Sequence, residues 1–183
     1  MYCRYFDGNR QEIYPSIQSF VFPEFAVHCC SRSGAHYLSV TTNPSDIVTE
    51  YATIIDRRKD EPKYFLSICL APMYGYERKW LLLAELIEHY RIQGIDHFYL
   101  YIKDMDNYTF KLIKYYEKIG IAEVIRFREY NDRPGQEWQL VGTQDCLQRS
   151  RHHSRYAIFQ DLDERIVPAG DVKLRNLIKE AIH

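Results

Sequence analysis

Two aspartates separated by one residue follow an apolar stretch late in the chain: Asp161 and Asp163 come directly after residues 156–160. If the strand continues through them, both carboxylates lie on one face, with Cα atoms about 6.6 Å apart. Two such carboxylates can share one hard divalent cation, Mg²⁺ or Mn²⁺. The alternative is that both acids are solvated or paired with arginine. Glu164 would face the opposite side and pair with Arg165 or another base.

The acids need a scaffold, and the second part of the chain alternates apolar runs of strand length with helical patterns. Strands are predicted at 64–70, 97–102, 122–127 and 156–160. The first run is almost continuously apolar, which is typical of a strand buried on both faces. The third alternates more, which places it nearer an edge. This order predicts an α/β fold with a mostly parallel sheet flanked by helices.

Ligands bind beyond the carboxyl ends of the strands in such sheets, and the two aspartates follow one of those ends. Helices are predicted between the strands, ending at Gly94 and Gly120, with a weaker one over 137–150. A last helix is expected after Asp171, which can cap it. Trp80 is expected in the core, and Asp145 is expected to orient a loop or to pair with Arg149, one helical turn later.

The N-terminal part is harder to interpret. Strands are predicted at 19–30 and 35–41, and the charged segment 56–62 is taken as a linker. We therefore expect a small β-rich extension over 1–62 and the main domain over 63–183.

Composition narrows the function. The chain has 183 residues, 46% of them hydrophobic, and a net charge of −1, which argues against non-specific nucleic-acid binding. It has neither an apolar run of the roughly 20 residues needed to cross a bilayer nor an N-terminal signal-peptide pattern. Taken alone, the chain is expected to be soluble.

The five cysteines lack C-x-x-C spacing, so a zinc site is not expected. Cys69 and Cys146 lie within apolar patterns and are expected to be small buried hydrophobic residues. Cys3, Cys29 and Cys30 could form a bridge in an oxidising compartment.

Neither G-x-G-x-x-G nor a Walker A motif is present, so the sequence does not support dinucleotide binding or a backbone phosphate cradle. A cation held by Asp161 and Asp163 could instead stabilise a departing diphosphate, as nucleotide-sugar transfer requires. Basic residues before the last strand either approach that diphosphate or complement a helix C-terminus. They are Arg149, Arg151, His152, His153 and Arg155.

Four separated blocks resemble the family 92 glycosyltransferases, whose fold is of the GT-A type with a Rossmann-like nucleotide-sugar half. The blocks are residues 70–81, 88–99, 144–151, and 161–164 with Pro168, and the resemblance covers 63–170. It implies transfer of a hexose, galactose in the characterised activity, from a UDP-sugar to a glycan with Mn²⁺ (or Mg²⁺).

By this similarity Asp163 would bind the metal directly, and Asp161 would contact the ribose or the metal shell. The other positions implied near the nucleotide are Tyr74, Glu77, Arg78 and Asp104. Glu77 could equally be a first-turn acid that favours the helix dipole, and Asp104 a simple loop acid.

The family typically has an N-terminal membrane anchor, which implies a Golgi membrane protein with a luminal domain. It also has an acceptor-binding half with the general base beyond the acid pair. We expect neither part within these 183 residues, so the chain alone is expected to be inactive. One alternative is a degenerate, non-catalytic member that binds nucleotide-sugar, glycan or a partner. The other, a haloacid dehalogenase-type phosphatase, is disfavoured because Arg165 stands where a Thr or Val is usual and the motif lies late in the chain.

Overall fold

The computed structural model describes residues 1–23, 26–58, 60–127 and 135–182, and the chain divides into two compact units, Met1–Asp56 and Arg57–His183. Each unit is described by itself. The charged segment that we interpreted as a linker over 56–62 begins at this division.

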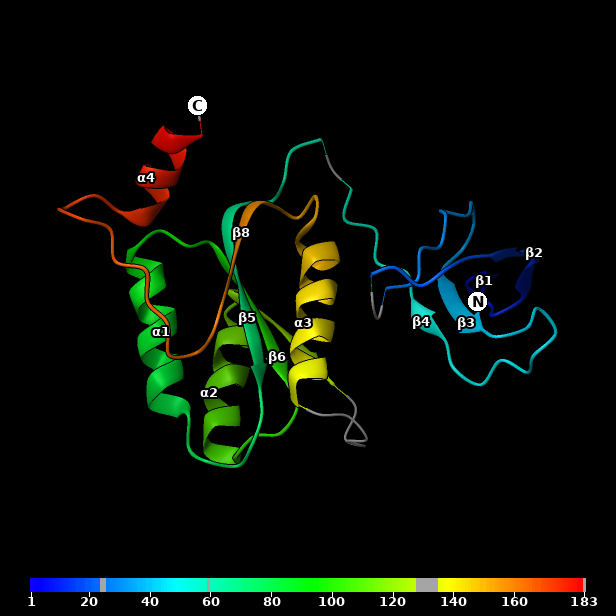
Figure 1. The fold of residues 1–183 in the computed structure, drawn as a ribbon, viewed down its shortest axis with the longest axis horizontal. Coiled ribbons are helices and arrows are strands. Elements are labelled where there is room, and N and C mark those ends of the chain that lie inside the picture. Colours follow the sequence, from blue (N-terminus) through cyan, green and yellow to red (C-terminus); the bar gives the residue numbers. More distant parts are fainter. Residues whose placement is uncertain (24–25, 59, 128–134, 183) are drawn as a thin grey trace. The chain divides into compact units, whose positions relative to one another are not determined.

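The N-terminal unit is an antiparallel sheet in the order β2-β1-β3-β4 (Figure 1). Its strands are β1 (Tyr2–Phe6), β2 (Glu12–Gln18), β3 (Tyr37–Thr41) and β4 (Ala52–Thr53). The strand predicted at 35–41 is confirmed as β3. The strand predicted at 19–30 is wrong, because the described part of that segment forms only an isolated bridge between Val21 and Val27. A disulfide between Cys3 and Cys29 ties the segment to β1 instead.

The second unit contains the predicted parallel sheet, in the order β7-β6-β5-β8. Its strands are β5 (Tyr64–Met73), β6 (His97–Ile102), β7 (Ala122–Arg126) and β8 (Ser154–Gln160). The almost continuously apolar strand β5 lies inside the sheet between β6 and β8, and β7 lies at an edge. Both predictions for these strands are confirmed.

Helices cover both faces of this sheet: α1 and α2 lie on one side and α3 on the other (Figure 1). The helices are α1 (Trp80–Ile92), α2 (Asn107–Lys118), α3 (Gly135–Ser150) and α4 (Leu174–Ala181). The predicted cap of α4 is wrong, since Lys173 rather than Asp171 occupies the N-cap. The expectation that Trp80 lies in the core is wrong, because its side chain is exposed at the start of α1, with its ring edge-on to Tyr108. None of the helices described here is long and apolar enough to span a bilayer.

Alternation along the strands separates two packing layers. Leu66, Ile68 and Leu70 of β5 pack with α1 and α2, in a cluster that includes Leu83 and Ile113. The side chain between two of them, Cys69, faces the other way toward Tyr99, Tyr101 and Cys146. This alternation is the two-residue period of a strand, and it brings β5 against α3.

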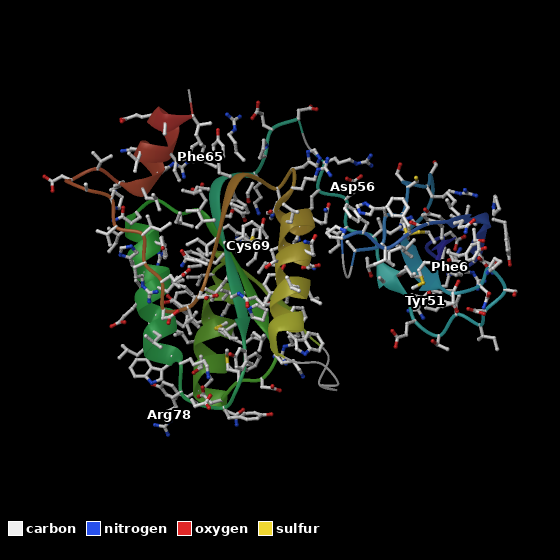
Figure 2. The ribbon with its side chains drawn as sticks, viewed as in Figure 1. Phe6, Tyr51, Asp56, Phe65, Cys69 and Arg78 are labelled. Atoms are coloured by element: carbon white, nitrogen blue, oxygen red, sulfur yellow. A yellow bond between two sulfur atoms is a disulfide. The ribbon has the colours of Figure 1, made fainter. Side chains whose placement is uncertain are left out.

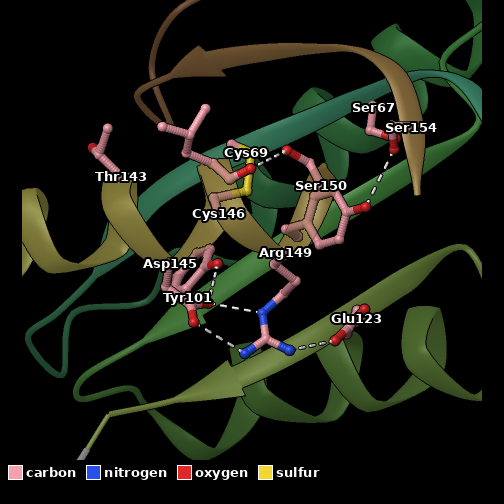
Figure 3. The surroundings of a disulfide bond; sticks show 12 residues. Ser67, Cys69, Tyr101, Glu123, Thr143, Asp145, Cys146, Arg149, Ser150 and Ser154 are labelled. Atoms are coloured by element: carbon pink, nitrogen blue, oxygen red, sulfur yellow. Dashed lines mark hydrogen bonds and ion pairs between the residues drawn. A yellow bond between two sulfur atoms is a disulfide. The ribbon is translucent and has the colours of Figure 1, made fainter. Parts of the chain in front are cut away.

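Cys69 and Cys146 form a disulfide that links β5 to α3 (Figure 3). The prediction that they are separate buried thiols is therefore wrong. Their Cα atoms are 6.0 Å apart, a usual separation for a disulfide. The bridge joins positions 77 residues apart, so only the packing of α3 on the sheet reveals it. Of the three N-terminal cysteines, Cys30 remains a free, exposed thiol.

Candidate functional site

The acid pair lies in a turn at the carboxyl edge of the parallel sheet. Strand β8 ends at Gln160, so strand alternation does not place Asp161 and Asp163, as we had assumed. Leu162 packs against the main core cluster, while both flanking aspartates are exposed. Strand alternation was predicted to position the two carboxylates. Instead, the packing of Leu162 against the core leaves both of them at the surface.

Helix α1 holds the segment that follows the turn. The backbone N–H of Ile166 donates to Tyr90 Oη at 2.8 Å, and the His89 ring bonds Ile166 O at 3.1 Å. The Arg165 guanidinium donates to the carbonyls of Leu162 at 2.7 Å and Leu82 at 3.0 Å. The turn is thus fixed to α1 through backbone groups rather than through its acids.

These contacts correct the interpretation of Glu164. Its carboxylate accepts a hydrogen bond from the Asp161 backbone N–H at 2.9 Å, while Arg165 bonds carbonyl groups. Glu164 therefore closes the acidic turn on the same side as Asp161 and does not face away from it.

A cavity of about 570 Å³ opens beside the turn, and Asp161 and Asp163 line it together. The other lining residues are Ala71, Pro72, Met73, Tyr74, Glu77, Lys79, Gln139 and Leu162. Of the predicted nucleotide-binding residues, Tyr74 and Glu77 are thus brought to the acids. Arg78 lies on the loop between β5 and α1 (Figure 2), and neither it nor Asp104 is part of this lining.

The acid pair suits a hard cation. Among the described residues, no ion pair uses the carboxylate of Asp161 or Asp163, and carboxylate oxygens are preferred ligands of Mg²⁺ and Mn²⁺. Glu77 differs, because Lys79 Nζ lies 2.8 Å from its carboxylate. The hydrogen bond from Lys79 lowers the pKa of Glu77. The residues that remain available to a metal here are therefore the two aspartates.

A second, smaller cavity of about 210 Å³ adjoins the same turn. It is lined by Cys69, Leu70, Ala71, Gln139, Gly142, Thr143, Phe159, Gln160, Asp161 and Glu164. Ala71, Gln139 and Asp161 belong to both cavities. Sequence reasoning missed Gln139 and Gln160. In the sequence, Gln160 could have been noticed as a polar residue at the carboxyl end of an apolar strand.

A different polar group lies at the amino ends of the strands, where β6, β7 and β8 begin. His97, Glu123 and His153 have ligand atoms within 4.8 Å of one another, close enough to hold a metal ion. Burial, and then His153, lower the pKa of His97 to about 4, so its imidazole is neutral at physiological pH. The three residues are far apart in sequence, so no short motif in the sequence indicated that they would lie together.

Two arginines already neutralise the carboxylate of this group. Arg57 and Arg149 approach the Glu123 oxygens to 2.6 Å and 2.8 Å, respectively. Burial works to raise the pKa of Glu123, but bonds from these arginines outweigh it and lower that pKa. Arg57 also bonds His153 Nδ1 at 2.7 Å. The surrounding positive charge opposes a divalent cation, in contrast to the acid pair.

Arg149 confirms one prediction and, with its basic neighbours, decides between the two alternatives for the basic residues before β8. Arg149 Nε lies 2.7 Å from Asp145 Oδ2, as the helical spacing predicted (Figure 3). Arg149 and His153, however, bond groups at the amino ends of the strands, and Arg155 pairs with Glu61 at 2.8 Å. These basic residues therefore lie away from the carboxyl edge that a diphosphate would occupy.

The parallel sheet flanked by helices, with an acid pair beyond its carboxyl edge, places the protein among α/β proteins with a GT-A-like fold. Comparison with known proteins then identifies the family. A sequence model of glycosyltransferase family 92 matches residues 64–181, and the chain belongs to this family.

Two relatives come from Caenorhabditis elegans. The chain is similar to beta-1,4-galactosyltransferase galt-1, with 34% identity over 126 residues, covering 66% of this chain and 29% of the relative. It is also similar to glycosyltransferase family 92 protein F13G3.3, with 28% identity over 120 residues, covering 59% and 23% of the two chains. The chain thus spans less than a third of either relative.

Proposed function

We propose that this chain binds the UDP-sugar donor for transfer of a hexose, galactose by analogy with the first relative, to a glycan acceptor. The observation that carries the proposal is that Asp161 and Asp163, neither paired with a cation among the described residues, line one cavity with Tyr74 and Glu77. Family membership and the galactosyltransferase named among the relatives support the same direction.

In this proposal Asp163 binds Mn²⁺ (or Mg²⁺) directly, and Asp161 contacts the metal shell or the ribose. When bound, the ion would stabilise the departing diphosphate as a Lewis acid. Tyr74 and Glu77 would contact the nucleotide from the facing wall of the cavity. Arg78 and Asp104, which are outside that lining, are not required for this mode of binding.

The proposed setting is the lumen of the secretory pathway, with anchorage to the Golgi membrane as in the family. The disulfides Cys3–Cys29 and Cys69–Cys146 support it, because such bonds persist in oxidising compartments. Non-specific nucleic-acid binding is not proposed, given the net charge of −1.

Thermal unfolding with Mn²⁺ and UDP tests the proposal. At UDP concentrations roughly 100 times Kd, the unfolding temperature should rise by about 5 °C or more. Asp163→Asn should abolish the rise, since it removes the metal ligand. His97→Phe is the matched control for the second polar group and should retain the rise. If the wild-type chain shows no shift, or if only His97→Phe loses it, the proposed site is wrong.

A further inference from the structure

The first turn of α2 contains an N-glycosylation sequon, Asn107-Tyr108-Thr109, which plays no part in the candidate site. Asn107 is the first residue of the helix, and its side chain is exposed. The other Asn-x-Ser/Thr triplet of the sequence, Asn43-Pro44-Ser45, is excluded by the proline in its middle position. Asn107 is therefore the one asparagine of the sequence that this modification could use.

The start of α2 tolerates a group attached to Asn107. The helix is capped by Asp106, whose carboxylate accepts hydrogen bonds from the backbone N–H groups of Tyr108 and Thr109 at 3.0 Å each. The cap therefore depends on the Asp106 side chain and on the backbone of the sequon. The exposed carboxamide of Asn107 can be modified without loss of that cap.

The hydroxyl of the sequon, in contrast, is enclosed in the folded domain. Thr109 has an exposed fraction of 0%. Its hydroxyl donates a hydrogen bond to Asp106 Oδ2 and accepts one from the backbone N–H of Lys79 at 3.0 Å. An enzyme that recognises this hydroxyl as part of the sequon cannot reach it once α2 has packed against α1. Any glycan transfer must therefore precede the folding of this part of the chain.

A separate observation supports the compartment that such a modification requires. The disulfides Cys3–Cys29 and Cys69–Cys146 are typical of a chain that folds in an oxidising lumen. Sequons are acceptors in proteins that enter this compartment. The exposed acceptor and the disulfides thus agree on the same environment.

We propose that Asn107 is N-glycosylated as the chain enters the secretory pathway, before α2 folds. This inference rests on the luminal setting of the proposed function. Asn107 Nδ2 forms a bond to the anomeric carbon of the first sugar of a lipid diphosphate-linked oligosaccharide. The bond from that carbon to the diphosphate breaks, the lipid diphosphate leaves with the electron pair, and Nδ2 releases one proton to the medium. The resulting glycan is carried at the carboxyl edge of the sheet, because α2 follows the carboxyl end of β6.

Expression of the full chain behind a secretory leader in eukaryotic cells tests the acceptor. Wild type should carry one glycan that peptide N-glycosidase removes, converting Asn107 to aspartate in the peptide mass spectrum. Asn107→Gln should lose the glycan, whereas Thr109→Ser, which keeps the hydroxyl of the sequon, should retain it. A wild-type chain without a glycan overturns the proposal.

The excluded triplet provides a matched control. Asn43, Pro44 and Ser45 are all exposed, and Pro44→Ala turns them into an acceptor sequence. In the Asn107→Gln background this variant should be glycosylated. If it carries a glycan and wild type does not, the transferase reaches the chain and passes over Asn107, so the proposal is wrong.

The order of events has its own test. Folded chain made without the transferase should stay unmodified when it is incubated with the transferase and a lipid-linked oligosaccharide. Modification of this folded chain would refute the claim that burial of Thr109 closes the sequon.

The failure of this inference can be separated from the failure of the proposed function. Asn107 does not line the cavity of about 570 Å³ that holds both aspartates, so Asn107→Gln should retain the rise in unfolding temperature with Mn²⁺ and UDP. A glycosylated wild type that shows no such rise would leave the modification standing and refute the nucleotide site. A rise without a glycan would do the reverse.

Discussion

Gly142 of α3 lies so close to Pro72 of β5 that a Cβ at position 142 would come 2.7 Å from Pro72 Cγ and 3.1 Å from Cδ. Side chains do not normally approach that closely, so the helix reaches the sheet here because residue 142 has no side chain. Gln139, which lines both cavities, lies almost one turn earlier on the same helix. The glycine therefore helps to set the distance between α3 and the proposed donor site.

Gly142→Ala should lower the free energy of unfolding by about 1–3 kcal/mol, measured by urea denaturation, because the added methyl group overpacks this contact. A loss of stability would be informative, because helix propensity alone predicts a gain: Ala is ordinarily favoured over Gly inside a helix by about 1 kcal/mol. In a Pro72→Ala background the cost should shrink, and a double-mutant cycle measures that coupling. An unchanged or more stable single variant would show that the contact relaxes freely.

Tyr101→Phe should destabilise the second unit by about 1.5–3 kcal/mol, the usual value for a hydrogen bond to a charged group. The buried Tyr101 hydroxyl donates to Asp145 Oδ2 at 2.6 Å, and burial, followed by the Asp145 charge, raises the pKa of Tyr101. Tyr115→Phe is the control, since Tyr115 is 55% exposed, and should cost no more than about 0.5 kcal/mol. Equal effects of the two substitutions on chemical denaturation would contradict the assignment.

Stability should fall as the pH drops from about 6.5 toward 4, because of His97. Its folded-state pKa is lowered to about 4, mainly by burial, so the unfolded chain takes up a proton in this window that the folded chain does not. The loss is about 3 kcal/mol at most, and His97 contributes none of it above pH 6.5.

His97→Phe isolates this contribution, because it leaves the neighbouring charges of Arg57, Glu123 and His153 in place. Denaturation across the pH range should show a shallower decline for the variant between pH 6.5 and 4. Parallel curves for the two proteins would mean that His97 is protonated in the folded state at the same pH as in the unfolded state.

A chain that begins at residue 57 should be more stable than one that begins at residue 63. Arg57 bonds Glu123 at 2.6 Å and His153 at 2.7 Å, so the shorter chain leaves a partly buried carboxylate with one arginine fewer. The expected difference in unfolding free energy is about 1–3 kcal/mol. Arg57→Met in the full chain should reproduce it. Identical urea midpoints for the two truncated chains would show that Arg57 adds nothing.

The sheet of the second unit could be predicted because its signals are local. The apolar run of β5 requires burial on both faces, and the glycines at 94 and 120 follow the helices α1 and α2 at the expected places. The position of the acids beyond β8 follows from strand order alone. The N-terminal unit was harder to predict from the sequence. Strand β2 contains Pro15 and two exposed positions in its middle, so it lacks a clear strand pattern.

The details of the candidate site depend on tertiary contacts that no spacing encodes. The Cys69–Cys146 bridge and the group of His97, Glu123 and His153 each join residues from separate elements. Gln160 looked like an ordinary strand residue, and only its burial without a hydrogen-bond partner among the described residues distinguishes it. The predicted arrangement of Asp161 and Asp163 came from strand geometry, whereas Leu162 is what holds the turn.

The pairing of β5 with β8 also affects the order in which the second unit folds. These neighbours are separated in the chain by α1, β6, α2, β7 and α3, so their contact closes a long loop, a step with high entropic cost that slows folding. The acidic turn follows β8 directly and is oriented only after that strand docks. Competence to bind a cation at these acids should therefore emerge late in refolding, after the hydrophobic layer between β5, β6 and α1 has formed.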